Sequence, residues 1–240
     1  IILKKQINYY IELDIEKHFN NPIIRFYVNV TKKNTNYFTF YSCIYLLLFT
    51  YSLSFNQINI LTMIQFFLSY LLTDFISGIV HLYLDNSNIK FDYSLTDYYR
   101  TGFEIHHTFP TWQWLIDPEY KPQYEMLTLF VPMIFLLYIN ILSFNSIFIT
   151  FITLFSLLMQ YFHYSAHAFI HGKKIPTIIR FLQKYNVIIS PETHRIHHIY
   201  FDRNYTILNG WTNFIFNKFF INNKDKIELF IKKLDDMIDL

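Results

Sequence analysis

The chain has 240 residues, of which 52% are hydrophobic, 21% aromatic and only 16% charged, with a formal net charge of +2 at pH 7. Because an average soluble domain carries about 25% charged residues, this composition favours a membrane unit, and the near-neutral charge argues against nucleic acid as a partner. The single cysteine, Cys43, excludes an internal disulfide and a cysteine-built zinc or iron–sulfur site.

Residues 1–37 are more polar than residues 38–84. They contain no continuous apolar core ending in small residues, so the sequence predicts no cleavable signal peptide there. We expect a cytosolic or interfacial segment. Its histidine, His18, is predicted to be a solvated bystander.

Four long apolar stretches lie at about 38–55, 58–84, 127–144 and 146–170. Each approaches or exceeds the ~20 residues that a helix needs to cross ~30 Å of hydrocarbon. None contains lysine or arginine, and only a few residues join the members of each pair. The sequence therefore predicts an all-α membrane protein with four transmembrane helices in two hairpins. The alternative is the buried helical core of a soluble protein.

The positions of the lysines and arginines predict how the protein is oriented in the membrane. All 20 lysines and arginines lie before the first span, between the second and third, or after the fourth, and none lies in the two short hairpin connections. By the positive-inside rule, both termini and the central loop are predicted to be cytosolic.

The chain ends in a charged segment with apolar residues at helical spacing. These residues are Ile227, Phe230, Ile231, Leu234 and Ile238. The pattern predicts an amphipathic helix over 224–240, either on the membrane or simply packed on the rest of the protein. The intervening residues 38–223 are then predicted to form one membrane domain.

Eight of the ten histidines fall into four clusters, all on the predicted cytosolic side. They are His81, His106, His107, His163, His167, His194, His197 and His198. Since imidazole is a strong ligand for iron, copper and zinc, this arrangement predicts a cytosolic, histidine-rich metal cap on the spans. Eight imidazoles suit two ions, each with four ligands and an open position. The ninth candidate, His171, is predicted to be a loop residue near headgroups.

The spacings divide the histidines further. Histidines 163 and 167 share one helical face, the triplet at 194–198 forms a compact half-site, and the adjacent pair 106–107 can serve two different metals. Asp74, Gly78, His81 and Asp85 also share a face. An aspartate inside a span costs about 2.5 to 3.5 kcal/mol on insertion scales, so Asp74 and Asp85 are predicted to face inward, where each would accept the N–H of a metal-binding imidazole.

Several runs carry a family resemblance. Residues 74–81 with Asp85 resemble the D-x-x-[ST]-G-x-x-H-W-x-x-D pattern of the Kua family of lipid desaturases. Residues 103–107 look like its F-x-x-H-H, residues 163–167 like its H-x-x-x-H, and residues 194–198 like its H-x-x-H-H. Residues 204–207 and 210–213 are similar to its N-Y-C-I and G-W-x-N. The family includes the plasmanylethanolamine desaturases and the plant plastid desaturase of phosphatidylglycerol.

This resemblance implies that the eight clustered histidines bind two iron ions, with no catalytic residues beyond the ligands and with O2 as co-substrate. It implies a multi-pass enzyme of the endoplasmic-reticulum type, a phospholipid substrate and an electron donor such as cytochrome b5 or ferredoxin. The preferred substrate is a 1-O-alkyl (plasmanyl) ethanolamine phospholipid, which would become the vinyl ether of plasmalogens. Leu82 and Thr193 depart from the family pattern.

The sequence leaves other functions open. The chain is alternatively a phospholipid acyl-chain desaturase of the plant plastid type or a di-iron lipid hydroxylase, although the order of the histidine motifs argues against the hydroxylase. A zinc-binding membrane protein and an inactive relative that acts as a scaffold are the non-enzymatic alternatives.

Overall fold

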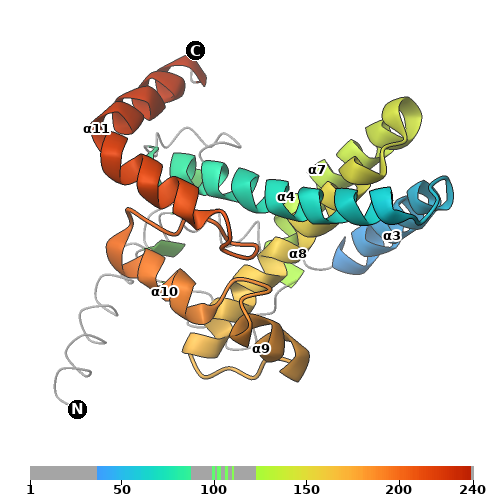
Figure 1. Ribbon diagram of the computed structural model, residues 1–240, viewed down its shortest axis with the longest axis horizontal. Coiled ribbons are helices and arrows are strands. Elements are labelled where there is room, and N and C mark those ends of the chain that lie inside the picture. Colours follow the sequence, from blue (N-terminus) through green and yellow to red (C-terminus); the bar gives the residue numbers. More distant parts are fainter. Residues whose placement is uncertain are drawn as a thin grey trace.

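The computed structural model describes residues 37–87, 99–100, 102–103, 106–107, 110 and 123–238, and there is no strand among these residues. The regular elements among the described residues are seven α-helices and one π-helix (Figure 1). In chain order they are α3 (Phe38–Ser54), α4 (Ile60–Asn86), α7 (Gln123–Ile139), the π-helix η2 (Asn140–Phe144), α8 (Ile147–Ile170), α9 (Thr177–Lys184), α10 (Pro191–Tyr200) and α11 (Asn213–Ile238). All but the last residue of the predicted N-terminal segment 1–37 lie outside the described part.

The apolar helices lie where the sequence predicts them. Three are long and apolar enough to cross a membrane, namely Ile60–Asn86, Met126–Phe144 and Ile147–Ile170. The fourth, α3, is apolar but has only 17 residues. A fourth span at α3, the two-hairpin topology and its orientation therefore remain predictions.

Polar side chains hold these apolar helices together. Helix α8 packs against α3, α4 and α7. The Ser52 and Thr150 hydroxyls lie 2.6 Å apart, and the Tyr45 and Thr153 hydroxyls 3.1 Å apart, so both pairs join α3 to α8. The buried Asn140 amide donates to the Ser146 carbonyl over 3.0 Å and so closes the α7–α8 hairpin. Such hydrogen bonds tie helices together where surrounding lipid provides no hydrophobic drive for association.

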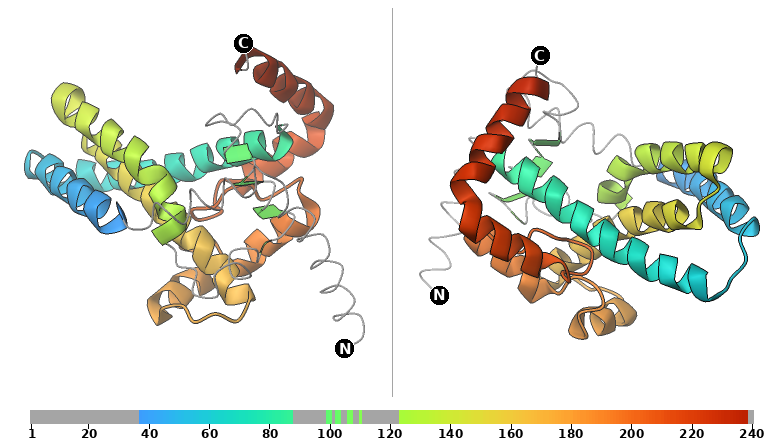
Figure 2. Two further views of the ribbon diagram at one scale, coloured as in Figure 1. Left: turned by 180° about the vertical axis from the view of Figure 1, so that it is seen from behind. Right: turned by 45° about the horizontal axis from the view of Figure 1, so that its top comes forward.

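Helix α4 connects the apolar helices α3, α7 and α8 to the later helices α10 and α11. Its 27 residues extend over about 40 Å. Its amino end lies beside α3, whereas its carboxyl half packs against α11 and contacts α10 through His81 and His197 (Figures 1 and 2). The carboxyl end of α8 reaches α10 as well. The ends of the two helices that carry His81, His163 and His167 are thereby brought to one side of the molecule.

A glycine allows α11 to approach α4 closely. A Cβ atom on Gly78 would lie 2.5 Å from the Phe216 ring and 2.7 Å from the Thr206 methyl group, which is closer than real contacts allow. Only glycine therefore fits at position 78 with Phe216 and Thr206 in their present places.

The predicted tail helix is the second half of α11, after the non-helical residue Asn223. Ile227 and Ile231 are buried with Phe216, and Phe75 of α4 packs against the same cluster. These contacts favour the packing alternative over a tail that lies only on the membrane.

Candidate metal centre

Helix α10 carries the histidine triplet, and its two ends are specified locally. The Ser190 side chain accepts the Thr193 backbone N–H over 3.2 Å, and Pro191 occupies the first turn. Both features favour the start of a helix. The helix ends at Phe201, whose φ of 48° is left-handed. The ten residues in between bury His194 and His197 completely.

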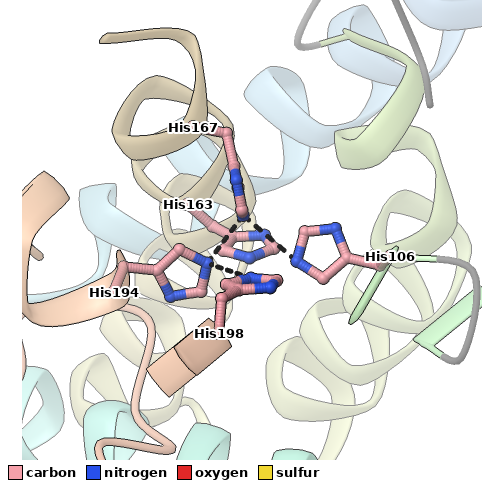
Figure 3. A group of neighbouring side chains, drawn as sticks. All are labelled: His106, His163, His167, His194 and His198. Atoms are coloured by element: carbon pink, nitrogen blue, oxygen red, sulfur yellow. Dashed lines mark hydrogen bonds between the residues drawn. The ribbon is translucent and has the colours of Figure 1, made fainter. Parts of the chain in front are cut away.

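Five histidines from three segments meet in one group, called here the five-histidine group (Figure 3). They are His106, His163, His167, His194 and His198. The Nε2 atom of His167 lies 3.1 Å from Nε2 of His106 and 2.7 Å from Nε2 of His194. Nε2 of His198 lies 3.1 Å from Nε2 of His194. The ring nitrogens of α8 and α10 thus converge on one point with that of His106.

A second group, called here the carboxylate group, lies directly beside the first. It consists of His81, Asp85, His107 and His197. Nε2 of His81 lies 3.1 Å from Nε2 of both His107 and His197. The Asp85 carboxylate lies 3.5, 3.0 and 3.3 Å from Nε2 of His81, His107 and His197, respectively. The rings of His107 and His198 stack with centroids 4.8 Å apart and so connect the two groups.

These separations fit metal coordination. Two nitrogens bound to one ion at about 2.1 Å lie about 3.0 Å apart at a right angle and about 3.4 Å apart in a tetrahedron. The observed 2.7 to 3.1 Å matches the right-angle arrangement of five or six ligands. Since one imidazole nitrogen cannot be a good donor to two others, a shared cation explains the convergence better than a hydrogen-bonded chain does.

Two further observations support metal binding. Nδ1 of His197 donates to the Arg203 carbonyl over 2.7 Å, which leaves the lone pair on Nε2 for a metal. The buried carboxylate oxygens of Asp85 make no hydrogen bond of good geometry among the described residues. Their lone pairs face the ring nitrogens, and a cation between them would remove the repulsion.

Three of the candidate ligands, which lie outside the spans, are buried in a way that favours the neutral imidazole, the form that binds metal. Burial lowers the pKa of His106 and of His194 well below the usual range, and neighbouring imidazoles lower it further. The pKa of His198 is lowered by the same causes. Since burial disfavours the charged form, these rings are neutral at neutral pH and offer a lone pair.

The candidate ligands divide differently from the expectation. The eight histidines divide into five and three, not four and four, and Asp85 completes the smaller group. The triplet is not one half-site, because His194 and His198 are related by i, i+4 and share a face, whereas His197 is turned away into the other group. His106 and His107 do enter different groups. His171 is exposed at the end of α8, outside both.

Asp74 differs from the expectation of an imidazole partner. Its buried carboxylate accepts the backbone N–H groups of Asn209, Gly210 and Thr212 over 2.9, 3.1 and 3.0 Å, and the Thr212 hydroxyl over 2.7 Å. One helix turn later, Ser77 accepts the Ile207 N–H over 3.2 Å. Asp74 therefore attaches the loop that follows α10 to α4.

Replacing Asp74 with asparagine should destabilise the protein by about 2 to 5 kcal/mol, because an amide nitrogen would face backbone N–H donors in a buried site. Thermal unfolding in detergent would measure the loss. Asp202→Asn is the matched control, since Asp202 pairs with Arg203 at the surface. Equal unfolding temperatures for the two variants would contradict the role assigned to Asp74.

Several residues that support the site had no role predicted from the sequence. Asn213 accepts the Thr206 N–H over 3.0 Å, and the amides of Asn204 and Asn217 pair over 3.0 Å. The Tyr205 ring packs against His197 with centroids 5.2 Å apart. All but Asn217 lie in the runs 204–207 and 210–213, so the motif resemblance was the available signal, although their partners are remote in the chain.

Comparison with known proteins agrees with this architecture. The family model of the lipid desaturase domain matches residues 70–236, which include all eight clustered histidines and Asp85. Searches among curated proteins and among solved structures found no match. The matched region is well over half of the 240 residues. The chain therefore belongs to the lipid desaturase domain family.

Proposed function

We propose that the protein is a membrane-bound di-iron lipid desaturase. The observation that carries the proposal is the pair of adjacent ligand groups, one with five imidazoles and one with three imidazoles and a carboxylate. Nitrogen and oxygen donors of this kind suit iron. Zinc has no redox chemistry and could not serve a reaction that removes two hydrogens from a carbon chain.

The chain's own residues would hold the two ions and keep their surroundings dry. The five-histidine group would bind one iron and the carboxylate group the other. Bound iron would supply the reduction of O2, so that –CH2–CH2–, O2, two electrons and two protons give –CH=CH– and two water molecules. The Arg203 carbonyl orients His197, and the complete burial of His194 and His197 limits access of water.

The preferred substrate is a 1-O-alkyl ethanolamine phospholipid, which would yield a vinyl ether. The motif resemblance supports this choice. The metal groups include residues near the carboxyl ends of two candidate spans, α4 and α8, where a chain of either lipid can enter from the bilayer. An acyl chain of a phospholipid is the second candidate. We further propose a location in the endoplasmic reticulum, a cytosolic metal site and a donor such as cytochrome b5.

Lipid analysis tests the proposal. Expression in cells that lack plasmalogens should produce acid-labile vinyl ethers, each lighter than its precursor by two hydrogens. His194→Ala serves as the inactive control. A new acyl double bond without vinyl ether would identify the second candidate, and a product heavier by one oxygen would refute desaturation.

A further inference from the structure

Helix α9 and the residue that follows it carry one buried and one exposed set of apolar side chains. Ile179 is buried against α8 and Leu182 packs beside it. In the exposed set, Ile178, Phe181 and Tyr185 are 61, 54 and 59% exposed. Their spacing of three and four residues places them on one helical face. A helix outside the candidate spans thus leaves a row of large apolar side chains uncovered.

The charged residues around this face are all positively charged. Between residues 171 and 190 the chain has four cations and no acidic residue. Lys173, Lys174, Arg180 and Lys184 are all exposed. Two of them lie over aromatic rings, Arg180 over Phe169 at 5.3 Å and Lys184 over Tyr185 at 5.7 Å. An apolar row beside cations is typical of helices that lie in the headgroup region of anionic membranes.

The apolar face continues onto a candidate span. The Trp211 indole N–H donates to the Asn186 carbonyl over 2.6 Å, immediately after α9. Its ring lies 6.1 Å from the Phe67 ring of α4, and Trp211 and Phe67 are 40 and 50% exposed. The Tyr70 hydroxyl of α4 donates to the Val187 carbonyl. These two contacts join Trp211 and the segment after α9 to the outer surface of α4, within the candidate span Ile60–Asn86.

We propose that α9, with Trp211, is an interfacial anchor that lies in the headgroup region of an anionic bilayer. Ile178, Phe181 and Tyr185 enter the acyl boundary, and the four cations contact lipid phosphates. A bilayer explains the continuity with α4, since the same surface then runs from the hydrocarbon to the headgroups. The anchor fixes the height of α10 above the membrane surface. It requires only the membrane placement of α4, not the proposed reaction.

Spin labels test the depth of α9 in the bilayer. In a Cys43→Ser background, a nitroxide at Phe181→Cys would be compared with one at Glu192→Cys, on the exposed first turn of α10. The full chain would be reconstituted in phosphatidylcholine vesicles with about one third phosphatidylglycerol. We expect the label at 181 to collide with O2 and not with a water-soluble nickel complex, at a depth of about 5 to 10 Å. The label at 192 should show the reverse.

A second set of variants tests whether the four cations draw α9 toward anionic lipid. Glutamine at Lys173, Lys174, Arg180 and Lys184 should make the label at 181 shallower in anionic vesicles and remove the difference between anionic and neutral vesicles. A control variant exchanges four exposed lysines of α11 instead. These are Lys218, Lys226, Lys232 and Lys233. The control should keep the depth of the parent protein.

Three results would overturn the proposal. One is equal exposure to water at 181 and 192. Another is the same depth in neutral and anionic vesicles. The third is dipolar broadening at 181, which would show that a second copy of the chain covers this face. None of these results depends on lipid desaturation, so failure here is distinct from failure of the proposed function.

Discussion

His194→Ala is expected to reduce lipid product at least about 100-fold and to lower the iron content of the purified protein. His194 is completely buried, and its Nε2 lies 2.7 Å from that of His167 and 3.1 Å from that of His198, so its loss removes one side of the five-histidine group. Loss of even an outer partner of a metal ligand typically costs 10- to 100-fold, and loss of the ligand itself should cost more.

The matched control is His171→Ala. His171 lies one helix turn after His167 on the same chain segment, but it is exposed and belongs to neither ligand group. Product formation and metal content should stay near those of the parent protein. Lipid mass spectrometry and elemental analysis check both outcomes, and an equal loss in the two variants would contradict the ligand assignment. Two zinc ions per chain, with no iron after anaerobic reconstitution, would refute the redox function.

Asp85→Asn is expected to remove one metal ion selectively. The substitution keeps the shape of the side chain but removes the negative charge from the carboxylate group, whereas the five-histidine group contains no acidic residue. Elemental analysis should therefore find about one ion per chain in place of about two, and lipid product should fall at least about 10-fold. His197→Ala should act on the same ion.

The metal count also separates two roles for Asp85. A carboxylate that only received an imidazole N–H would leave both ions bound after the substitution, with reduced activity. Asp202→Asn, a change at a half-buried residue that pairs with Arg203 and belongs to neither group, should alter neither quantity. Two firmly bound ions in Asp85→Asn would contradict its place as a ligand.

Much of the site was predictable because it depends on local spacing. His163 and His167, like His194 and His198, are four residues apart, and a helix places such residues on one face whatever its surroundings. The apolar stretches likewise predicted α4, α7 and α8 within a few residues, because continuous apolar length is a property of the sequence itself.

The tertiary structure decided the features that depend on remote contacts. Which group each of His106, His107 and His197 enters follows from how α4, α8 and α10 cross, and no local spacing contains that information. Asp74 had to be hydrogen-bonded because a buried carboxylate is costly alone, but its partners lie 135 to 138 residues later in the chain.

The sequence by itself thus predicted the long apolar helices, the candidate ligand histidines and the need to pair each buried charge, because helical periodicity and desolvation act locally. Only the tertiary structure determined the five-and-three division of the histidines, the position of Asp85 among them and the uncovered face of α9. The physical reason is that these features arise from packing between segments far apart in the chain. Many different helix arrangements are compatible with the same sequence spacing, so spacing alone does not select one of them.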